Sequence, residues 1–411
     1  MKPNRKIEKL NLLLKKHHQY RETCLNLIAS ENTPSPLVEA LFDERLSRRY
    51  GNYTGIDLFQ RNYKGNRHIA EIEAYTHSLA KDLFSASFVD IRPLSGNIAG
   101  IAATFALAEP GDTVLEVHDG HSYAHKLASS PLRVDLESIP IPWDEQRSNI
   151  NLPETLKLIE AHKPQIVNIG SGVFLFPQPV SELKSVMRDV NPGSYLIYDA
   201  AHVIGLIAGG RFQSPLKEGA DVIISSTHKT LAGPQGGMVL TNDKSIAERI
   251  ADTLYPLLMS NHHLSRLPAL AMTFIEWKVF GEEHADAIVS NAKALGQTLE
   301  ERGVPVYCAE FDFTESHTII PIVSEFGDGD EIADQLEACN IIAGAVSVSP
   351  DGDVCGLRLG VQEVTRWGMT PEDAPEIADC IVDALNGKSA DEVKPEVARL
   401  ARRFDTVQFT F

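Results

Sequence analysis

Short apolar runs alternate with segments of helical periodicity through the middle of the chain. Such runs, bounded by polar and turn residues, are typical of buried strands. We expect strands at residues 112–117, 165–169, 195–198, 221–224 and 238–240. Strands that alternate with helices in this way predict an α/β fold, with a mainly parallel sheet and helices on both of its faces.

The N-terminal part of the chain shows helical spacing that is interrupted by one long loop. Apolar residues recur at helical intervals in residues 7–20, 37–49 and 69–84, so we expect helices there. Residues 50–68 are rich in Tyr, Gly, Asn and Arg. Loops of this length without secondary structure of their own are often functional. We therefore expect this loop to contribute to a site.

A second compositional unit follows a helix-rich stretch that reaches about residue 290. Its short apolar runs lie at 318–323, 341–346 and 356–359, with helical segments from about residue 330 and one last helix after Thr370. This order indicates a smaller α+β domain. A chain of 411 residues also exceeds what one hydrophobic core usually supports. The expected domains are an N-terminal arm with helices at 1–47, a large domain at 48–285 and a small C-terminal domain at 286–411.

The composition of the chain argues against several classes of protein. The net charge is −18 and the isoelectric point is near 5.2, which argues against a surface for nucleic acids or anionic membranes. The five cysteines are odd in number and include no CxxC pair, so neither a disulfide framework nor a zinc site is expected. No segment has the length and apolarity of a membrane span, and no apolar stretch follows the basic N-terminus. We expect a cytoplasmic protein that binds a small molecule and no metal.

Chemically reactive side chains follow two of the predicted strands. The run Asp221–Ile224 leads into Ser-Ser-Thr-His-Lys, which places Lys229 at a strand end. The run Tyr195–Tyr198 leads into Asp199 and, three residues later, His202. Ligands bind outside the carboxyl ends of the strands in open α/β sheets, so these three side chains would face one site. Taken singly, the lysine also fits an exposed surface residue and the aspartate a helix cap.

A further feature is the start of a predicted helix that is suited to an anion. Ser95, Gly96 and Asn97 precede an alanine-rich apolar segment, and the N–H groups at a helix start favour a phosphate. The same residues also fit an ordinary helix cap. In combination with Lys229 and Asp199, they suggest pyridoxal phosphate. A lysine forms a Schiff base with this cofactor, a carboxylate keeps its pyridine nitrogen protonated and a helix start holds its phosphate.

Several strings of residues match a known family, in that family's order. The most specific is Ser226-Thr-His-Lys-Thr-Leu-Ala-Gly-Pro234. The others are Leu27-Ile-Ala-Ser-Glu-Asn32, Pro93-Leu-Ser-Gly96, Pro110-Gly-Asp-Thr113, Asp199-Ala-Ala-His-Val-Ile-Gly-Leu-Ile-Ala208 and Gly356-Leu-Arg-Leu-Gly360. With these strings the chain resembles the serine hydroxymethyltransferase family. The resemblance implies fold type I of the pyridoxal phosphate enzymes, the aspartate aminotransferase-like fold, with a large, mainly parallel sheet of the seven-stranded type.

The resemblance gives roles to the residues around the cofactor. It implies that Lys229 carries pyridoxal 5'-phosphate covalently, that Asp199 binds the pyridine nitrogen and that His202 lies near the ring hydroxyl. His121 would stack on the face of the ring. The residues implied at the phosphate are Ser95, Gly96, Asn97 and His228.

The resemblance also implies an active site that is shared between subunits. Arg358 would bind the α-carboxylate of an amino-acid substrate through its bidentate fork, with Ser30 assisting. The alternative for this arginine is a structural ion pair. Tyr50, at the cofactor, and Tyr63, at the substrate, look like the loop tyrosines that the family supplies from the neighbouring subunit. The active unit would then be a homodimer or a dimer of dimers.

The chain departs from the family pattern in the loop that handles the substrate hydroxyl. Asn52 stands where the family loop has a glutamate that transfers a proton. An amide is no general base, and the nearest carboxylate in the loop is that of Asp57. The reaction at the hydroxyl is therefore expected to differ from that of the family.

Two other segments also differ from the family. A glycine-rich clamp that the partner subunit lends to the phosphate is replaced within residues 255–268, where we expect the side chains of His262, His263 or Arg266 to take its place. Residues 346–352 replace an Asn-rich segment that contacts folate. We therefore expect a reaction without tetrahydrofolate.

The expected function is that of a pyridoxal phosphate enzyme acting at Cα of an α-amino acid, with aldol-type cleavage or formation of a carbon–carbon bond. Loss of any one Cα substituent gives a carbanion that this cofactor stabilises, so related outcomes stay open. One alternative is a specialised-metabolism relative that performs β-elimination, decarboxylation or oxidative deamination on an amino-acid conjugate. Another is a non-catalytic cofactor-binding protein, although the retention of Lys229 and Arg358 counts against it.

Overall fold

The computed structural model describes residues 3–117, 121–131, 133–348 and 354–411, which form two compact units. The larger unit consists of Ser30–Asp286 and Phe409–Phe411. The smaller unit consists of Met1–Ala29 and Ala287–Gln408, so the N-terminal segment groups with the C-terminal part of the chain.

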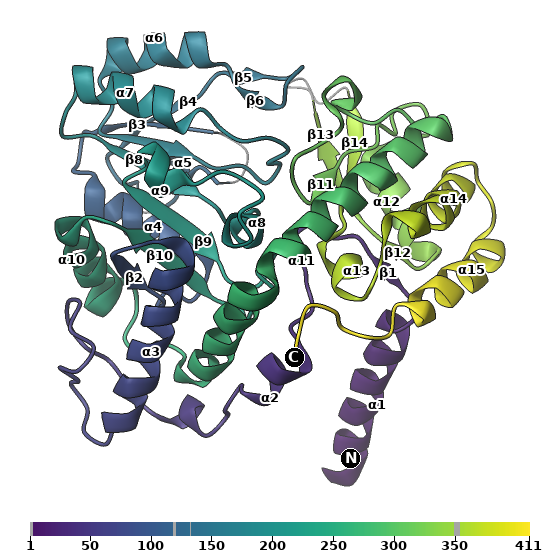
Figure 1. Cartoon of the computed structure of the whole chain (residues 1–411), viewed down its shortest axis with the longest axis horizontal. Coiled ribbons are helices and arrows are strands. Elements are labelled where there is room, and N and C mark those ends of the chain that lie inside the picture. The colour runs from purple at the N-terminus through teal and green to yellow at the C-terminus, as the bar shows by residue number, and fades with distance from the viewer. Residues whose placement is uncertain (1–2, 118–120, 132, 349–353) are drawn as a thin grey trace. The chain divides into compact units, whose positions relative to one another are not determined.

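A seven-stranded sheet with the strand order β2-β10-β9-β8-β7-β3-β4 forms the centre of the larger unit (Figure 1). Only β10 runs against the others, because it is antiparallel to both of its neighbours while the remaining pairs are parallel. The predicted α/β fold with a mainly parallel sheet is thus confirmed. The strands are β2 (Phe88–Asp90), β3 (Thr113–Glu116), β4 (Glu137–Pro140), β7 (Ile166–Ile169), β8 (Tyr195–Asp199), β9 (Val222–Ser226) and β10 (Gly237–Thr241).

Helices cover both faces of this sheet (Figure 1). On one face, the alanines of α4 allow the helix to pack closely on buried Ile197, Val222 and Ile224. The helices of this unit are α2 (Pro36–Ala40), α3 (Arg67–Phe84), α4 (Gly96–Leu107), α5 (Tyr123–Ser129), α6 (Leu152–His162), α7 (Val180–Val190), α8 (Ile204–Ala208), α9 (Pro215–Glu218) and α10 (Lys244–Asp252). A small hairpin of β5 (Trp143–Asp144) and β6 (Asn149–Ile150) is added at the periphery. The long helix α11 (Leu267–Glu301) crosses the boundary between the units along the chain.

The smaller unit combines short strands with helices, as an α+β domain does. Its antiparallel sheet has the order β11 (Thr318–Ile319), β14 (Cys355–Gly360) and β13 (Gly344–Ser347), and β1 (Leu25–Asn26) pairs in parallel with β12 (Ile341–Ile342). Its helices, besides the end of α11, are α1 (Pro3–Arg21), α12 (Gly329–Ala338), α13 (Gln362–Arg366), α14 (Ala374–Leu385) and α15 (Ala390–Arg403). No helix in the described part of the chain combines the length and apolarity needed to cross a membrane.

Two predicted helices differ from those observed. The helix predicted for residues 37–49 ends after Ala40, because Asp43 turns the chain. Its Oδ1 accepts the N–H of Arg45 at 2.9 Å, and its own N–H donates to the backbone oxygen of Ser265 at 3.1 Å. The single helix predicted after Thr370 is two helices, since Ser389 begins α15 with a capping box.

Candidate active site

Lys229 and His202 lie together beyond the carboxyl ends of β9 and β8. These strands are parallel neighbours, with Asp199 opposite Ile224, so both end at the same edge of the sheet. The Nζ of Lys229 lies 3.0 Å from the Nε2 of His202. The hydroxyl of Thr230 donates to the backbone oxygen of His202 at 2.8 Å and so ties the two turns together. The structure therefore brings together two of the residues that the sequence predicts at one site.

Asp199, the last residue of β8, is a buried carboxylate with three hydrogen-bond partners. Its Oδ2 lies 2.6 Å from the Nδ1 of His121 and accepts the Tyr123 hydroxyl at 2.7 Å, while its Oδ1 accepts the Ala201 N–H at 2.9 Å. Burial raises the pKa of Asp199, but the charge and hydrogen bond of His121, with the other hydrogen bonds, outweigh burial and leave the pKa below its usual value. The carboxylate is therefore ionised at neutral pH, as a partner of a pyridinium nitrogen must be.

His121 and the start of α5 are held in place from two further strands. Asn168 on β7 donates its side-chain N–H to the backbone oxygen of His121 at 3.0 Å. Glu116, at the end of β3, is buried and accepts the N–H groups of Ala124 and His125 in the first turn of α5, at 3.1 and 2.6 Å. These two positioning residues, like Tyr123, are not among the residues predicted from the sequence. A polar residue inside an apolar strand, which must find a partner when buried, is the signal that would have revealed them.

The start of α4 supplies free N–H groups close to the end of β9. Ser95 caps the helix, because its Oγ accepts the N–H of Ile98 at 3.2 Å. The N–H groups of Gly96 and Asn97, in the first turn, have no carbonyl partner within the helix. A Cβ at position 96 would lie 2.5 Å from the Oγ of Ser226, so only glycine lets α4 begin this close to the strand end. This start of the helix fits a phosphate.

His228, which precedes Lys229, adds a buried polar atom to the same region. Its Nδ1 has no hydrogen-bond partner among the described residues. Burial, followed by the positive charges of Lys229 and Arg266, lowers the pKa of His228 to about 4, so the imidazole is neutral at pH 7. The orphaned nitrogen, the lysine and the ionised Asp199 together fit pyridoxal phosphate. The described residues hold no group of three or more His, Cys, Asp or Glu side chains suited to a metal ion.

Two of the side chains expected to replace the glycine-rich clamp have other partners. Arg266 is buried, and its guanidinium donates to four backbone oxygens, those of Ile91, Pro93, Gln235 and Gly237. A Cβ at Gly236 would lie 1.0 Å from its Nη1, so glycine is required there. His262 is buried too, with its Nε2 3.0 Å from the Oε1 of Glu73. The expectation for Arg266 and His262 is wrong, because both fasten the larger unit internally, and the exposed His263 stays a prediction.

The predicted loop tyrosines lie side by side and reach into solvent. The rings of Tyr50 and Tyr63 are 5.2 Å apart, and their exposed fractions are 52% and 50%. Asn66 donates its side-chain N–H groups to the backbone oxygens of Tyr50 and Tyr63, at 2.6 and 3.1 Å. The loop thus presents both phenols in a fixed arrangement, as a contribution to a neighbouring subunit would require.

A buried ion pair fastens this loop to α3. Glu73 accepts a hydrogen bond from Arg61 at 2.8 Å and one from the Tyr53 hydroxyl at 3.2 Å. The guanidinium groups of Arg61 and Arg92 lie 4.6 and 4.3 Å from the centre of the Tyr53 ring. Burial raises the pKa of Glu73, but the charges and hydrogen bonds of its basic neighbours, His262 first, hold it well below its usual value. The loop is therefore anchored by charges and does not depend on the exposed tyrosines for its shape.

Asn52, at the position of the family glutamate, is buried, whereas the nearby carboxylate of Asp57 is exposed. Asn52 is only 4% exposed, and its backbone oxygen accepts the N–H of Asn62 at 3.0 Å. Asp57 is exposed, and its Oδ1 accepts the N–H of Phe59 at 3.0 Å in a local turn. Asn52, an amide, thus supplies no general base at this position.

The predicted substrate residues lie in different units. Ser30 is half-buried in the larger unit, and Arg358 is half-buried on β14 of the smaller unit. Their role at a substrate carboxylate stays a prediction. The segment 346–352, on which the folate expectation partly rests, includes residues 349–352, which lie outside the described residues.

Known proteins are similar to this chain, in sequence or in structure, over nearly all of its length. A family model described as serine hydroxymethyltransferase matches residues 5–381. The serine hydroxymethyltransferase of Methanopyrus kandleri is 41% identical over 407 residues, covering 97% of this chain and 94% of that protein. That of Saccharolobus islandicus is 39% identical over 416 residues, covering 99% and 95%. A crystal structure of L-threonine transaldolase from Pseudomonas fluorescens superposes with a TM-score of 0.89 at 29% identity, covering 99% of this chain and 94% of that one.

The sheet, the strand-end lysine and the ionised aspartate are those of a pyridoxal phosphate-dependent enzyme of fold type I, and the chain is an enzyme of this class. Within the class, it belongs to the serine hydroxymethyltransferase family, since the family model and the relatives span almost all of its residues. The predicted family, fold type and enzyme class are thereby confirmed.

Proposed function

We propose that this enzyme catalyses aldol-type cleavage and formation of the Cα–Cβ bond of a β-hydroxy α-amino acid, without tetrahydrofolate. The observation that carries the proposal is the pairing of Lys229 Nζ with His202 Nε2 at 3.0 Å, next to an ionised, buried Asp199. The family of the chain and its similarity to a protein named L-threonine transaldolase support aldol chemistry over other reactions at Cα.

The residues of the larger unit would hold the cofactor at both of its ends. Lys229 would bind it covalently, Asp199 would pair with its ring nitrogen and His121 would lie at its ring. Its phosphate would be bound by Ser95, Gly96, Asn97 and His228. When bound, pyridoxal phosphate supplies an electron sink for the negative charge that develops at Cα.

His202 and Asp199 have separate tasks in proton handling. His202 is buried and lies in hydrogen-bond contact with Lys229. It would therefore give or take a proton at Nζ when Lys229 binds or releases the cofactor. Asp199 stays ionised because His121 and Tyr123 contact its Oδ2, and it therefore keeps a proton on a nitrogen placed beside it.

The residues of the loop 50–68 determine which side chain can transfer a proton at the substrate hydroxyl. Asn52 is buried and the Oδ1 of Asp57 is engaged in a turn, whereas the phenols of Tyr50 and Tyr63 lie paired at the surface of this loop. We propose that they reach the active site of a neighbouring subunit in a homodimer or a dimer of dimers, Tyr50 at the cofactor and Tyr63 at the substrate. The absence of a carboxylate at this position supports a reaction that does not follow the folate-dependent route of the family.

The substrate carboxylate would be bound by Arg358, with Ser30 assisting. A guanidinium presents two parallel N–H groups to a carboxylate, which fixes the orientation of the amino acid as well as its charge. A fixed orientation determines which bond at Cα lies where it can be broken, so these residues would influence the reaction as well as the affinity.

Product analysis tests the proposal. The enzyme, reconstituted with pyridoxal phosphate, is incubated with serine, threonine or allo-threonine, each with and without tetrahydrofolate, and glycine and aldehyde are measured. We expect threonine or allo-threonine to be cleaved without folate, and folate to change glycine release from serine by less than about twofold. Marked acceleration by folate would refute folate independence. Exchange of the glycine α-proton without any aldehyde product would refute the aldol reaction, and Lys229→Ala serves as the inactive control.

A further inference from the structure

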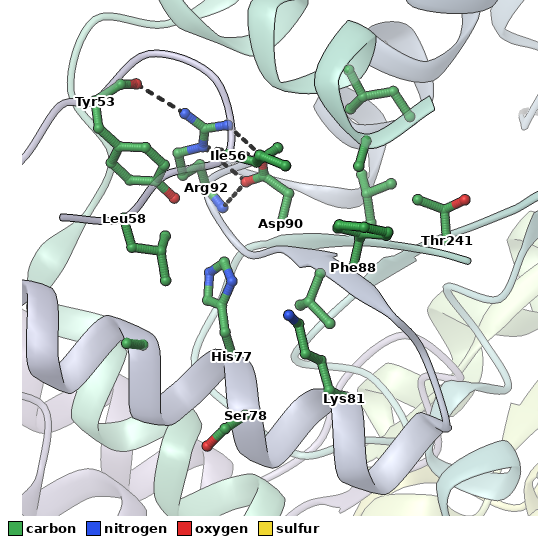
Figure 2. A pocket seen from close by; sticks show the side chains of 15 residues that line it. Tyr53, Ile56, Leu58, His77, Ser78, Lys81, Phe88, Asp90, Arg92 and Thr241 are labelled. Carbon is green, nitrogen blue, oxygen red and sulfur yellow. Dashed lines mark hydrogen bonds and ion pairs between the residues drawn. The ribbon is translucent and has the colours of Figure 1, made fainter. Parts of the chain in front are cut away.

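A cavity of about 280 Å³ lies in the larger unit, and neither Lys229 nor Asp199 lines it (Figure 2). Its walls come from α3, the edge strand β2, β10, α10 and the loop residues 53–58. The apolar part of the wall includes Ile56, Leu58, Phe88, Val239 and Ile250. A concave apolar cavity with a few polar groups is typical of sites for small molecules.

Lys81 is a cation in this wall without an anionic partner. Figure 2 shows its side chain rising from α3 toward β2. Its Nζ lies 5.8 Å from the centre of the Phe88 ring, and no carboxylate of the described residues forms an ion pair with it. Because the side chain is half-buried, its charge is only partly solvated, and an anion in the cavity would gain from contact with it.

The carboxylate that lines the cavity is already neutralised by its neighbour. Asp90 accepts hydrogen bonds from the Nε of Arg92 at 3.0 Å and from its Nη2 at 2.5 Å. The same guanidinium also donates to the backbone oxygens of Tyr53 and Gly55, at 3.1 and 3.3 Å. All of its terminal nitrogens are therefore engaged, and the positive charge that remains uncompensated in the wall is that of Lys81.

His77 supplies a neutral polar group one helical turn before Lys81. It is only 7% exposed, and its Nε2 is buried without a hydrogen-bond partner among the described residues. Figure 2 shows its ring on the same side of α3 as the lysine amine, facing the cavity. Burial lowers the pKa of His77 to about 4, since the attraction of Glu73 and Asp90 does not offset it. At neutral pH this imidazole is an uncharged group that lacks a hydrogen bond.

We propose that the cavity is a binding site for a small monocarboxylate with a compact apolar body, whose carboxylate contacts Lys81 and His77. One uncompensated cation matches one negative charge, and the apolar wall matches a ring or a branched chain. Inorganic phosphate would bring a second charge and no apolar group, so it fits less well. The site is separate from the reaction proposed above and does not depend on it.

Benzoate and its uncharged analogue benzamide are the probes, and titration calorimetry of the cofactor-loaded enzyme is the measurement. We expect benzoate to bind with a dissociation constant at or below about 1 mM and benzamide to bind at least about tenfold more weakly. Lys81→Met keeps the apolar stem and should weaken benzoate by about tenfold or more. Equal affinities for the two probes, no benzoate binding, or unchanged binding to Lys81→Met would each overturn the proposal.

Three further variants test where benzoate binds without a change at Lys81. Ala74→Phe fills the cavity from α3 without a change of charge, and it should abolish benzoate binding. Lys244→Met removes an exposed charge of α10 that does not line the cavity, so it should leave binding within about twofold of the unmodified enzyme. Arg358→Leu distinguishes this cavity from the predicted substrate site. Loss of benzoate binding in that variant, with retention in Lys81→Met, would place the ligand at the substrate site and refute the cavity.

Discussion

The amino group of Lys229 and the Nε2 of His202 are 3.0 Å apart, although the two residues belong to different strand ends. The parallel pairing of β8 with β9 creates this contact, because it brings both carboxyl ends to one edge of the sheet. His202 is buried, so solvent does not compete for its nitrogen. The pair is thus well placed for the proton exchange at Nζ that we propose.

His202→Gln should lower kcat by about tenfold to a hundredfold, because an amide keeps a hydrogen bond to Lys229 but does not accept its proton. The measurement is kcat across pH with the amino acid that the enzyme converts fastest. The pH profile of the variant should lack one of the ionisations seen in the unmodified enzyme. His162→Gln, at the exposed end of α6, is the matched control. A kcat within twofold of the control would contradict a proton-transfer role.

Asp199→Asn should reduce kcat by about a hundredfold or more, because it removes the negative charge that we propose to lie next to the pyridine nitrogen. The same substitution should also make the free energy of unfolding depend less on pH in acid. The folded-state pKa of Asp199 is lowered, so its ionised form stabilises the fold above the unfolded-state pKa of about 3.9, and this contribution is lost as pH falls through the folded-state pKa. Urea unfolding of the cofactor-free protein between neutral and acid pH measures it. If the free energy of unfolding falls equally in the variant and the unmodified protein as the pH is lowered, the lowered pKa of Asp199 is contradicted.

The sequence predicts that Lys229 and His202 meet at one edge of the sheet, because the relevant signals are local. A lysine after an apolar run and an aspartate before a histidine each mark a strand end, and the parallel order of the strands then brings them together. Apolar runs also mark the five inner strands. The edge strands β2 and β4 carry no buried-strand pattern, because their residues are half-exposed or exposed and of mixed polarity.

The contacts that fasten the loop 50–68 to α3 could not be predicted from local sequence patterns. His262 and Glu73 are 189 positions apart in the chain, and nothing in either local pattern indicates the partner. The prediction for the histidines near residue 262 is contact with a phosphate, whereas the Nε2 of His262 lies 3.0 Å from the buried carboxylate of Glu73. Asn168 and Glu116 could not be predicted for a different reason, since the apolar pattern that indicates a strand does not show what a polar residue within it contacts.

Glu73→Gln should lower the free energy of unfolding by about 3–5 kcal/mol, because it removes the negative charge that compensates buried Arg61. Glu71→Gln on the same helix is the matched control, since Glu71 is exposed and its pair with His68 contributes about 1 kcal/mol or less. Urea denaturation of both variants is the measurement. Equal midpoints for the two variants would show that the buried network does not stabilise the loop.

The pH dependence of stability should report His77. Its pKa of about 4 in the folded protein lies below the unfolded value of about 6.5. Between these two values, the unfolded chain binds a proton that the folded chain does not, so the free energy of unfolding decreases as pH falls from about 6.5 to about 4. His77→Phe should have a flatter profile in this window, whereas His68→Phe, at an exposed position of α3, should not. Identical profiles for all three proteins would refute this assignment.

Complementation between inactive variants tests whether the tyrosine loop serves a neighbouring subunit. If Tyr50 of one subunit completes the site that contains Lys229 of the other, a dimer of Lys229→Ala and Tyr50→Ala chains has one intact site. Random mixing, after dissociation and reassembly, should then restore about a quarter of the sites to activity. Lys229→Ala mixed with Asp199→Asn is the matched control. Both residues belong to the same unit of one chain, so every site keeps a defect and no activity should return. Recovery in the control, or none with Tyr50→Ala, would contradict a shared site.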